Sequence, residues 1–387
     1  MTHSGLFSLR RLHVFVCLLA TPLLFFIGVT GPALAASGCG LTARPGLQEI
    51  SFESDGLQRR VVVFVPPGYS AKTKLPVVFD LHGSNSFPRA QLTQSAWPDV
   101  AAENGFIVAA PEGGLNGKLP NTHAWNVPGV TPGGGPDDAE FLNEAIDQVK
   151  ARFCVDDTRL FASGYSGGGR MLSQYICNGN RDFSAAGFVM SLRAGYPMQQ
   201  QGKWMPDSKT CHPAQPVSII AFWGAKDNTN PYAGGGKPYW QYGGQMALNR
   251  WAELDGCAGP EKVSKGVKIS SAQFDRCKGG AQILSYTIAD QTHDWPAKTI
   301  SFSPVGTATE KTKVSDADGL YAAKRMWAFF ANSNGRLIAD GVAKTTCASS
   351  DKSGSPSSSM VDPACPAALK ATVKPKVVDG PMAADAL

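Results

Sequence analysis

The sequence contains no C-x-x-C pair and no cluster of cysteine with histidine, which are the patterns that indicate a structural zinc site. We therefore expect no metal ion. Basic residues are scattered along the chain, and the net charge is only +5 over 387 residues. Beyond the N-terminal segment there is no run of basic residues interleaved with aromatic ones. Nucleic acid is thus not an expected partner. The chain also has no internal repeat and carries no signal for an oligomeric state.

The first 36 residues have the pattern of an export signal. Arg10 and Arg11 precede an apolar run at residues 14–29, and the small residues at 33–36 provide a cleavage context. We expect a signal peptide over residues 1–36, cleaved near Ala35 to Ser37, and a secreted mature protein that is extracellular or periplasmic.

Two alternatives remain open for this segment. The apolar run approaches the length of a transmembrane helix, but Pro22 interrupts it, so we expect no stable membrane span. Residues 36–39 also form a weak lipoprotein box, which would attach a lipid to Cys39.

Eight cysteines remain once the leader is removed, and an even number in an exported chain favours disulfide bonds. We expect Cys257 to pair with Cys277, because the two flank a polar segment rich in glycine and lysine that a short cross-link would order. Cys347 with Cys365 is a second candidate pair.

Short apolar, β-branched runs alternate with helical patterns, which predicts an α/β fold with a mostly parallel sheet and helices on both faces. Helices are expected at 138–153, 170–176 and 320–330, and strands at 60–65, 77–81, 106–110, 160–163, 217–223 and 283–288. We assign residues 37–335 to one catalytic domain. Residues 336–387 are Ser-rich and poor in apolar periodicity, which is typical of a linker and disordered tail.

The strongest chemical motif is Gly164-Tyr165-Ser166-Gly167-Gly168, which lies between a predicted strand and a predicted helix. A serine on such a tight turn exposes its hydroxyl at the carboxyl edge of the sheet, and the flanking glycines avoid collisions there. Ser166 is therefore the candidate nucleophile.

A serine nucleophile needs a histidine base and a carboxylate that orients it, in the chain order Ser, Asp or Glu, His. Downstream of Ser166 the histidines are His212 and His293, and only His293 follows a core strand in a loop. Asp227 follows the strand at 217–223, whereas Asp294 is adjacent to the histidine and is expected to face solvent. Ser166, Asp227 and His293 form the predicted triad.

Acyl transfer also needs hydrogen-bond donors for the developing oxyanion. We expect the backbone N–H groups of Gly167 and of Ser84, which follows His82-Gly83 at the end of a strand. His82 precedes the nucleophile and is expected to shape this loop. Aromatic residues near these loops are candidates for the substrate pocket: Tyr165, Trp125, Tyr232, Tyr239 and Trp240.

Taken in order, these motifs resemble those of the secreted feruloyl esterase and polyhydroxybutyrate depolymerase group of α/β-hydrolases. The similarity runs from Cys39 to Phe330 and includes Leu81-His82-Gly83, Trp125-Asn126, Asp137-Asp138, residues 164–171, Asp227 with Pro231-Tyr232, and His293-Asp294-Trp295-Pro296. The resemblance implies the α/β-hydrolase fold and ester hydrolysis without a cofactor, by the triad named above.

Two turns depart from the pattern of that group. Residues 290–292 stand before His293 where glycines are usual, and residues 223–225 replace a His-Gly-Thr type of turn before Asp227. These changes leave the triad intact but alter the surroundings of the substrate.

The function that the resemblance implies is a serine esterase that releases hydroxycinnamates such as ferulate from plant cell-wall polysaccharide. An extracellular polyhydroxybutyrate depolymerase is the alternative, since either substrate, a polysaccharide or a polyester, presents an extended ester to an exposed cleft. A serine peptidase shares the triad geometry, but no gating domain accompanies this one. A non-catalytic binding protein would be expected to have lost a triad residue, and none is missing.

Overall fold

The computed structural model describes residues 37–127, 130–131, 134–259, 261–266, 268–296 and 321–333. Contacts divide the chain into a unit of residues 1–337 and a unit of residues 338–387, and all described residues belong to the first. The predicted signal peptide and tail lie outside the described residues, so the predicted domain boundaries stay a prediction. No helix within the described ranges is long and apolar enough to cross a membrane.

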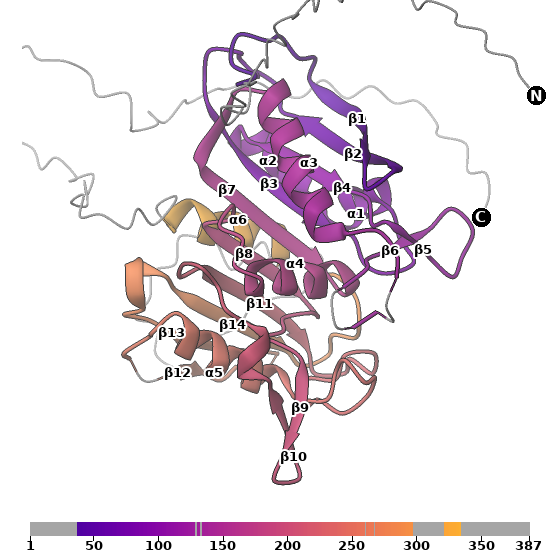
Figure 1. Cartoon of the computed structure of the whole chain (residues 1–387). Helices are drawn as coiled ribbons and strands as arrows, with labels where there is room; N and C mark the ends of the chain where they lie inside the picture. Colours follow the sequence, from indigo (N-terminus) through magenta and orange to yellow (C-terminus); the bar gives the residue numbers. More distant parts are fainter. Residues whose placement is uncertain are drawn as a thin grey trace, which may run out of the picture. The chain divides into compact units, whose positions relative to one another are not determined.

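A ten-stranded sheet forms the centre of the described unit (Figure 1). Its strand order is β1-β2-β4-β3-β7-β8-β11-β14-β13-β12, and the six strands from β4 to β14 in this order are parallel. The remaining pairs at both edges are antiparallel. The strands are β1 (Gly46–Ser54), β2 (Leu57–Val65), β3 (Leu75–Leu81), β4 (Ile107–Pro111), β7 (Val155–Tyr165), β8 (Ala185–Val189), β11 (Ser218–Gly224), β12 (Lys262–Ser264), β13 (Ile269–Phe274) and β14 (Ile283–Ile288).

Helices cover both faces of this sheet. One core cluster joins alternate strand residues such as Val77 and Phe79 to α3 (Asp138–Arg152), α4 (Gly167–Cys177) and α5 (Gly244–Leu254). The other joins residues such as Val78 to α1 (Pro88–Ser95), α2 (Trp97–Asn104) and α6 (Ala322–Asn332). Successive side chains of a strand point to opposite faces of the sheet, and apolar side chains are buried on both faces. The predicted α/β-hydrolase arrangement is confirmed.

Two small hairpins lie outside the main sheet: β5 (Leu115–Asn116) with β6 (His123–Ala124), and β9 (Pro197–Gln200) with β10 (Lys203–Pro206). The sequence patterns did not indicate either of them. They also do not indicate the strands β1, β8, β12 and β13 or the helices α1, α2 and α5, whereas each predicted strand and helix corresponds to an observed element.

The predicted pair Cys257–Cys277 is confirmed, and Cys39–Cys154 and Cys177–Cys211 are also bonded. The Cys39–Cys154 bond corrects the lipoprotein alternative, because the sulfur that would carry a lipid is already bonded to another cysteine. Cys347 and Cys365 lie outside the described residues.

A buried carboxyl group joins β3 to its neighbours. Asp80 is fully buried and accepts hydrogen bonds from the side chains of Gln91 at 3.1 Å, Ser95 at 2.8 Å and Ser163 of β7 at 2.7 Å. Burial raises the pKa of Asp80 to about 7, although these hydrogen bonds act in the opposite direction. The folded chain therefore retains this proton at pH values where an unfolded chain has released it.

We expect Asp80 to make stability depend on pH. Because its pKa is raised from 3.8 to about 7, its contribution is fully present below pH 4 and is lost as the pH rises towards 7. The free energy of unfolding of the wild type, relative to that of Asp80→Asn, should fall by about 4 kcal/mol over this range. Urea unfolding at pH 4 and pH 7 measures the difference, and a difference that stays constant would contradict the assignment.

Candidate active site

Ser166 follows the last residue of β7 and directly precedes α4. Its backbone has φ 48° and ψ −111°, a strained conformation for a residue with a side chain. The neighbouring chain is so close that a Cβ on Gly164 would lie 2.6 Å from the Gly169 Cα, and one on Gly168 would lie 2.4 Å from the Leu81 oxygen. The glycines of the motif are thus required by packing, and the turn holds the Ser166 hydroxyl at the carboxyl edge of the sheet.

The structure brings the predicted triad together. His293 Nε2 lies 2.8 Å from Ser166 Oγ, and His293 Nδ1 lies 2.8 Å from Asp227 Oδ2. Asp227 follows β11 and is almost fully buried, whereas the His293 loop follows β14, the strand next to β11. Three segments distant in sequence therefore meet at one edge of the sheet because their strands end there.

The loop after β11 holds Asp227 in a fixed orientation. Its Oδ1 accepts hydrogen bonds from the backbone N–H groups of Thr229 and Asn230, both at 2.8 Å, which leaves Oδ2 for the histidine. The Asn230 side chain in turn donates to the Met190 carbonyl at 2.7 Å. No sequence pattern indicates Thr229 or Asn230, because their contribution is a backbone turn that many residues can form.

The competing groups point elsewhere. The exposed side chain of Asp294 accepts a hydrogen bond from Thr292, and the exposed His212 lies on the segment before β11. Asp255, at the end of α5, accepts from the Val217 backbone N–H at 3.2 Å and is buried. The exposed Asp294 agrees with the expectation that it faces solvent, and none of these three groups takes the place of Asp227 or His293 in the hydrogen-bonded series.

The two predicted oxyanion donors are adjacent. A Cβ built on Gly167 would lie 2.9 Å from the Ser84 backbone nitrogen, so the two backbone segments are in close contact next to Ser166. Gly167 is the first residue of α4, where backbone N–H groups have no partner within the helix. Such a pair can stabilise negative charge that develops on a carbonyl oxygen.

His82 supports the loop that carries Ser84. Its Nδ1 donates to the Gly83 carbonyl at 2.8 Å, and its Nε2 accepts from the Gly113 N–H at 3.0 Å. Complete burial lowers the pKa of His82 to about 4, so the ring is neutral at neutral pH. Both ring nitrogens are engaged, and His82 cannot act as a base toward Ser166.

The aromatic residues proposed for the pocket differ in their surroundings. Tyr165 and Tyr232 are half-buried: the Tyr165 hydroxyl donates to the His293 carbonyl, and Tyr232 packs edge-on against Trp223. Burial raises the pKa of Tyr165 to about 12, so it remains a hydrogen-bond donor. Trp125 and Trp240 are corrected here, because both are buried and donate their ring N–H groups to backbone carbonyls of His82 and Pro231.

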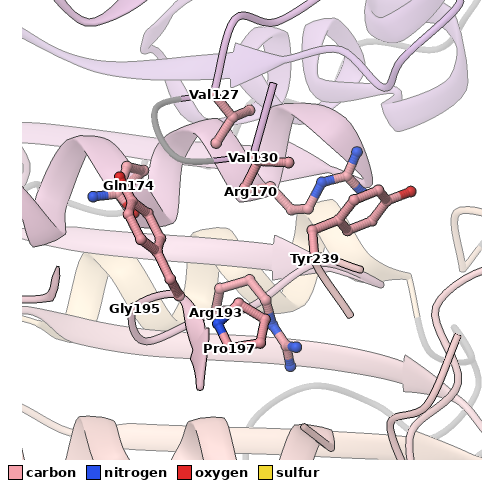
Figure 2. A pocket seen from close by; sticks show the side chains of 9 residues that line it. Val127, Val130, Arg170, Gln174, Arg193, Gly195, Pro197 and Tyr239 are labelled. Atoms are coloured by element: carbon pink, nitrogen blue, oxygen red, sulfur yellow. The ribbon is translucent and has the colours of Figure 1, made fainter. Parts of the chain in front are cut away.

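A small pocket lies along α4, starting one helical turn beyond Ser166 (Figure 2). Arg170 and Gln174 line it from the helix, and Arg193 and Tyr239 line it from later segments. Figure 2 shows Arg170 beside the Tyr239 ring, with Gln174 on the other side of the pocket. Of the predicted aromatic residues, Tyr239 is thus the one that lines this pocket, and its neighbour Trp240 lies beneath Arg193 at 3.8 Å.

The chain is similar to proteins that are named as esterases. No family model matches the chain. Feruloyl esterase B of Piromyces equi is 30% identical over 243 residues, which is 61% of this chain and 42% of that protein. The probable feruloyl esterase C of Aspergillus flavus is 24% identical over 266 residues, 67% of this chain and 83% of that protein.

Among solved structures, a CE1 ferulic acid esterase from Anaeromyces mucronatus matches 66% of this chain and 86% of its own, at 16% identity and a TM-score of 0.41. The chain spans less than half the length of the Piromyces relative. The resemblance to feruloyl esterases that the motifs indicated is confirmed by these sequence relatives.

Proposed function

We propose that the chain is a secreted serine carboxylic-ester hydrolase that releases hydroxycinnamates such as ferulate from plant cell-wall polysaccharide. The observation that carries this proposal is the continuous hydrogen-bonded series Asp227–His293–Ser166, with 2.8 Å at each step, on a strained turn that begins a helix. The similarity to proteins named feruloyl esterase supports the choice of acyl group.

The proposed reaction has two halves. In the first, Ser166 Oγ attacks the ester carbonyl carbon while His293 Nε2 takes the hydroxyl proton, and His293 then gives that proton to the departing alcohol oxygen. In the second, His293 takes a proton from water, the resulting hydroxide attacks the acyl-enzyme, and the proton returns to Ser166 Oγ as the acid leaves. Asp227 keeps His293 in the tautomer that presents Nε2 to the serine.

The oxyanion of each tetrahedral intermediate would accept hydrogen bonds from the N–H groups of Gly167 and Ser84. The His82 contact with Gly83 fixes the peptide that carries the Ser84 N–H, so this donor is already oriented before substrate binds. Tyr165 and Tyr232 are the proposed aromatic contacts for the substrate, and the mechanism needs no metal or organic cofactor.

Secretion is supported by three disulfide bonds in the described residues, because such bonds persist in oxidising compartments. The proposed export signal at residues 1–36 would deliver the chain there.

Initial rates of the purified mature protein on methyl ferulate and on dispersed polyhydroxybutyrate test the proposal, with Ser166→Ala as the blank. We expect Ser166-dependent release of ferulate. Clearing of the polymer without release of ferulate would overturn the assigned substrate and make the chain a depolymerase. Turnover of peptides but not of esters would contradict the esterase assignment itself.

A further inference from the structure

Two arginines are buried beside the pocket along α4. Arg170 is 8% exposed and Arg193 is 6% exposed, and both line the pocket. Within the described part of the chain neither forms an ion pair, and Arg170 Nε and Arg193 Nη2 have no hydrogen-bond partner. Removing a guanidinium from water without a counter-charge is costly, so buried charges are usually paired.

Elsewhere this chain does pair a buried arginine. Arg59, which is 4% exposed, forms an ion pair with the buried Asp138 at 2.6 Å and also donates to the Glu112 carbonyl at 2.7 Å. The described residues provide no such carboxylate for Arg170 or Arg193, which leaves both guanidinium groups able to accept an external counter-charge.

Aromatic rings and backbone carbonyls hold the two guanidinium groups in place. Arg193 lies between the rings of Trp240 and Tyr242, at 3.8 and 3.9 Å, and donates to the carbonyls of Leu192 and Tyr242 at 2.8 and 2.9 Å. Arg170 lies over the Tyr239 ring at 4.2 Å. Burial lowers the pKa of Arg193 to about 10, but the group remains charged at neutral pH. Arg193 is thus held in a fixed orientation by two rings and two carbonyls, and Arg170 is positioned by the Tyr239 ring.

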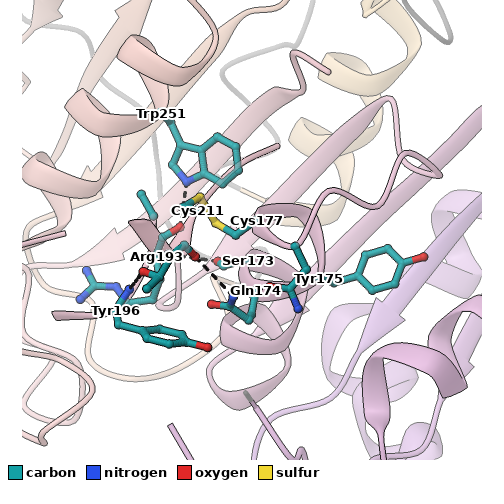
Figure 3. Close-up of a disulfide and its surroundings, with 12 residues drawn as sticks. Ser173, Gln174, Tyr175, Cys177, Arg193, Tyr196, Cys211 and Trp251 are labelled. Atoms are coloured by element: carbon teal, nitrogen blue, oxygen red, sulfur yellow. Dashed lines mark hydrogen bonds between the residues drawn. A yellow bond between two sulfur atoms is a disulfide. The ribbon is translucent and has the colours of Figure 1, made fainter. Parts of the chain in front are cut away.

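The walls of the pocket are also fixed. The Cys177–Cys211 bond ties the end of α4 to the segment before β11, where Gln174 of the helix approaches the Thr210 carbonyl (Figure 3). The backbone of Arg193 is held from two sides, because its N–H donates to Ser173 at 3.0 Å and its carbonyl accepts from Trp251 at 2.8 Å.

Helix α4 links the pocket to the nucleophile. Arg170 and Gln174 are four residues apart and lie along one side of α4, and Ser166 is the residue that directly precedes this helix. The Arg170 backbone N–H also donates to the Ser166 carbonyl at 3.1 Å. The residues that line the pocket from α4 therefore begin one helical turn after the nucleophile in the chain.

We propose that this pocket binds a carboxylate that the substrate carries outside the ester bond, namely that of an acidic sugar near the esterified position. Arginine suits this task because its planar fork matches the two oxygens of a carboxylate. The proposal extends the function proposed above, in that the same enzyme would prefer esters on uronic-acid-bearing polysaccharide over neutral ones.

Binding to the inactive Ser166→Ala protein tests the pocket independently of turnover. We expect calorimetry at low ionic strength to show that D-glucuronate binds roughly 10- to 100-fold more tightly than its uncharged amide, D-glucuronamide. Adding Arg170→Gln should remove this preference, and Arg170→Lys should leave an intermediate one. Arg181→Gln, which changes an exposed arginine, is the matched control and should retain the full preference.

Three results would overturn the proposal: equal binding of the acid and the amide, a preference that survives Arg170→Gln, or acetate binding as tightly as glucuronate, which would indicate a site for a small free anion. The active protein allows the same test by kinetics. The kcat/KM for a feruloyl ester on a glucuronate-bearing oligosaccharide is divided by the kcat/KM for the corresponding amide, and Arg170→Gln should lower this ratio by the same factor by which it lowers the binding preference. If the chain hydrolyses no ester at all, the proposed function fails, whereas the binding result still decides the role of the pocket.

Discussion

Replacing Ser166 by alanine should lower kcat on methyl ferulate by about 10⁴- to 10⁶-fold. The reason is geometric: Ser166 Oγ lies 2.8 Å from His293 Nε2, and alanine has no oxygen to attack the ester. Steady-state kinetics and circular dichroism measure the loss of turnover and the retention of the fold.

His293→Ala should lower the rate to a similar extent, and the double variant should be little worse than either single variant, because the two residues act as a unit. His212→Ala is the matched control, since it removes an exposed histidine that lies away from Ser166. A Ser166→Ala rate within tenfold of the wild type, or a large loss in His212→Ala, would contradict the proposed mechanism.

Removing the Cys39–Cys154 bond should cost about 5 kcal/mol of unfolding free energy, the largest loss among the three disulfides of the described chain. It closes a loop of 115 residues, against 34 for Cys177–Cys211 and 20 for Cys257–Cys277. A longer closed loop restricts the unfolded chain more, so the expected losses for the other two are about 4 and about 3 kcal/mol.

Paired Cys→Ser variants, unfolded in guanidinium chloride, measure these three values under one set of conditions. Each pair serves as the control for the other two, because every variant loses two sulfur atoms and one cross-link. A ranking in which the 20-residue loop contributes most would show that native contacts around the cysteines, rather than chain entropy, determine the stabilisation.

The central strands of the sheet could be predicted because they are dense in β-branched and apolar residues, as in β3 and β14. The strand β8, in contrast, has the sequence Ala-Ala-Gly-Phe-Val and carries little such signal. Its small residues are explained by packing: a Cβ on Gly187 would lie 2.5 Å from the sulfur of Met326 in α6. That contact joins segments about 140 residues apart, which no local pattern reveals.

The grouping of Ser166, Asp227 and His293 could be predicted because the fold fixes the order of the three and because each follows a recognisable strand. The burial of Trp240, in contrast, could not be predicted from the sequence. Its ring is covered by Arg193, which itself depends on Tyr242, Trp251 and Ser173 for its position. Composition can mark an aromatic residue as a candidate for a pocket, but burial is decided by such distant neighbours.

The same limit applies to Arg170. In the sequence Arg170 is one residue of the predicted helix that follows the Gly-rich motif. It becomes a candidate binding residue only because the folded chain buries it and no described carboxylate pairs with it. A charged residue is usually interpreted as exposed, and only the folded chain distinguishes the exception.

Labelling with a serine-directed fluorophosphonate tests the central claim most directly, because it reports an activated serine without depending on the choice of substrate. We expect intact-mass and peptide-mapping measurements to find one adduct per chain, on Ser166, with none on the Ser166→Ala or the heat-unfolded protein. An adduct on another residue, or a folded wild-type protein that does not react, would contradict the assignment of Ser166 and His293 as nucleophile and base.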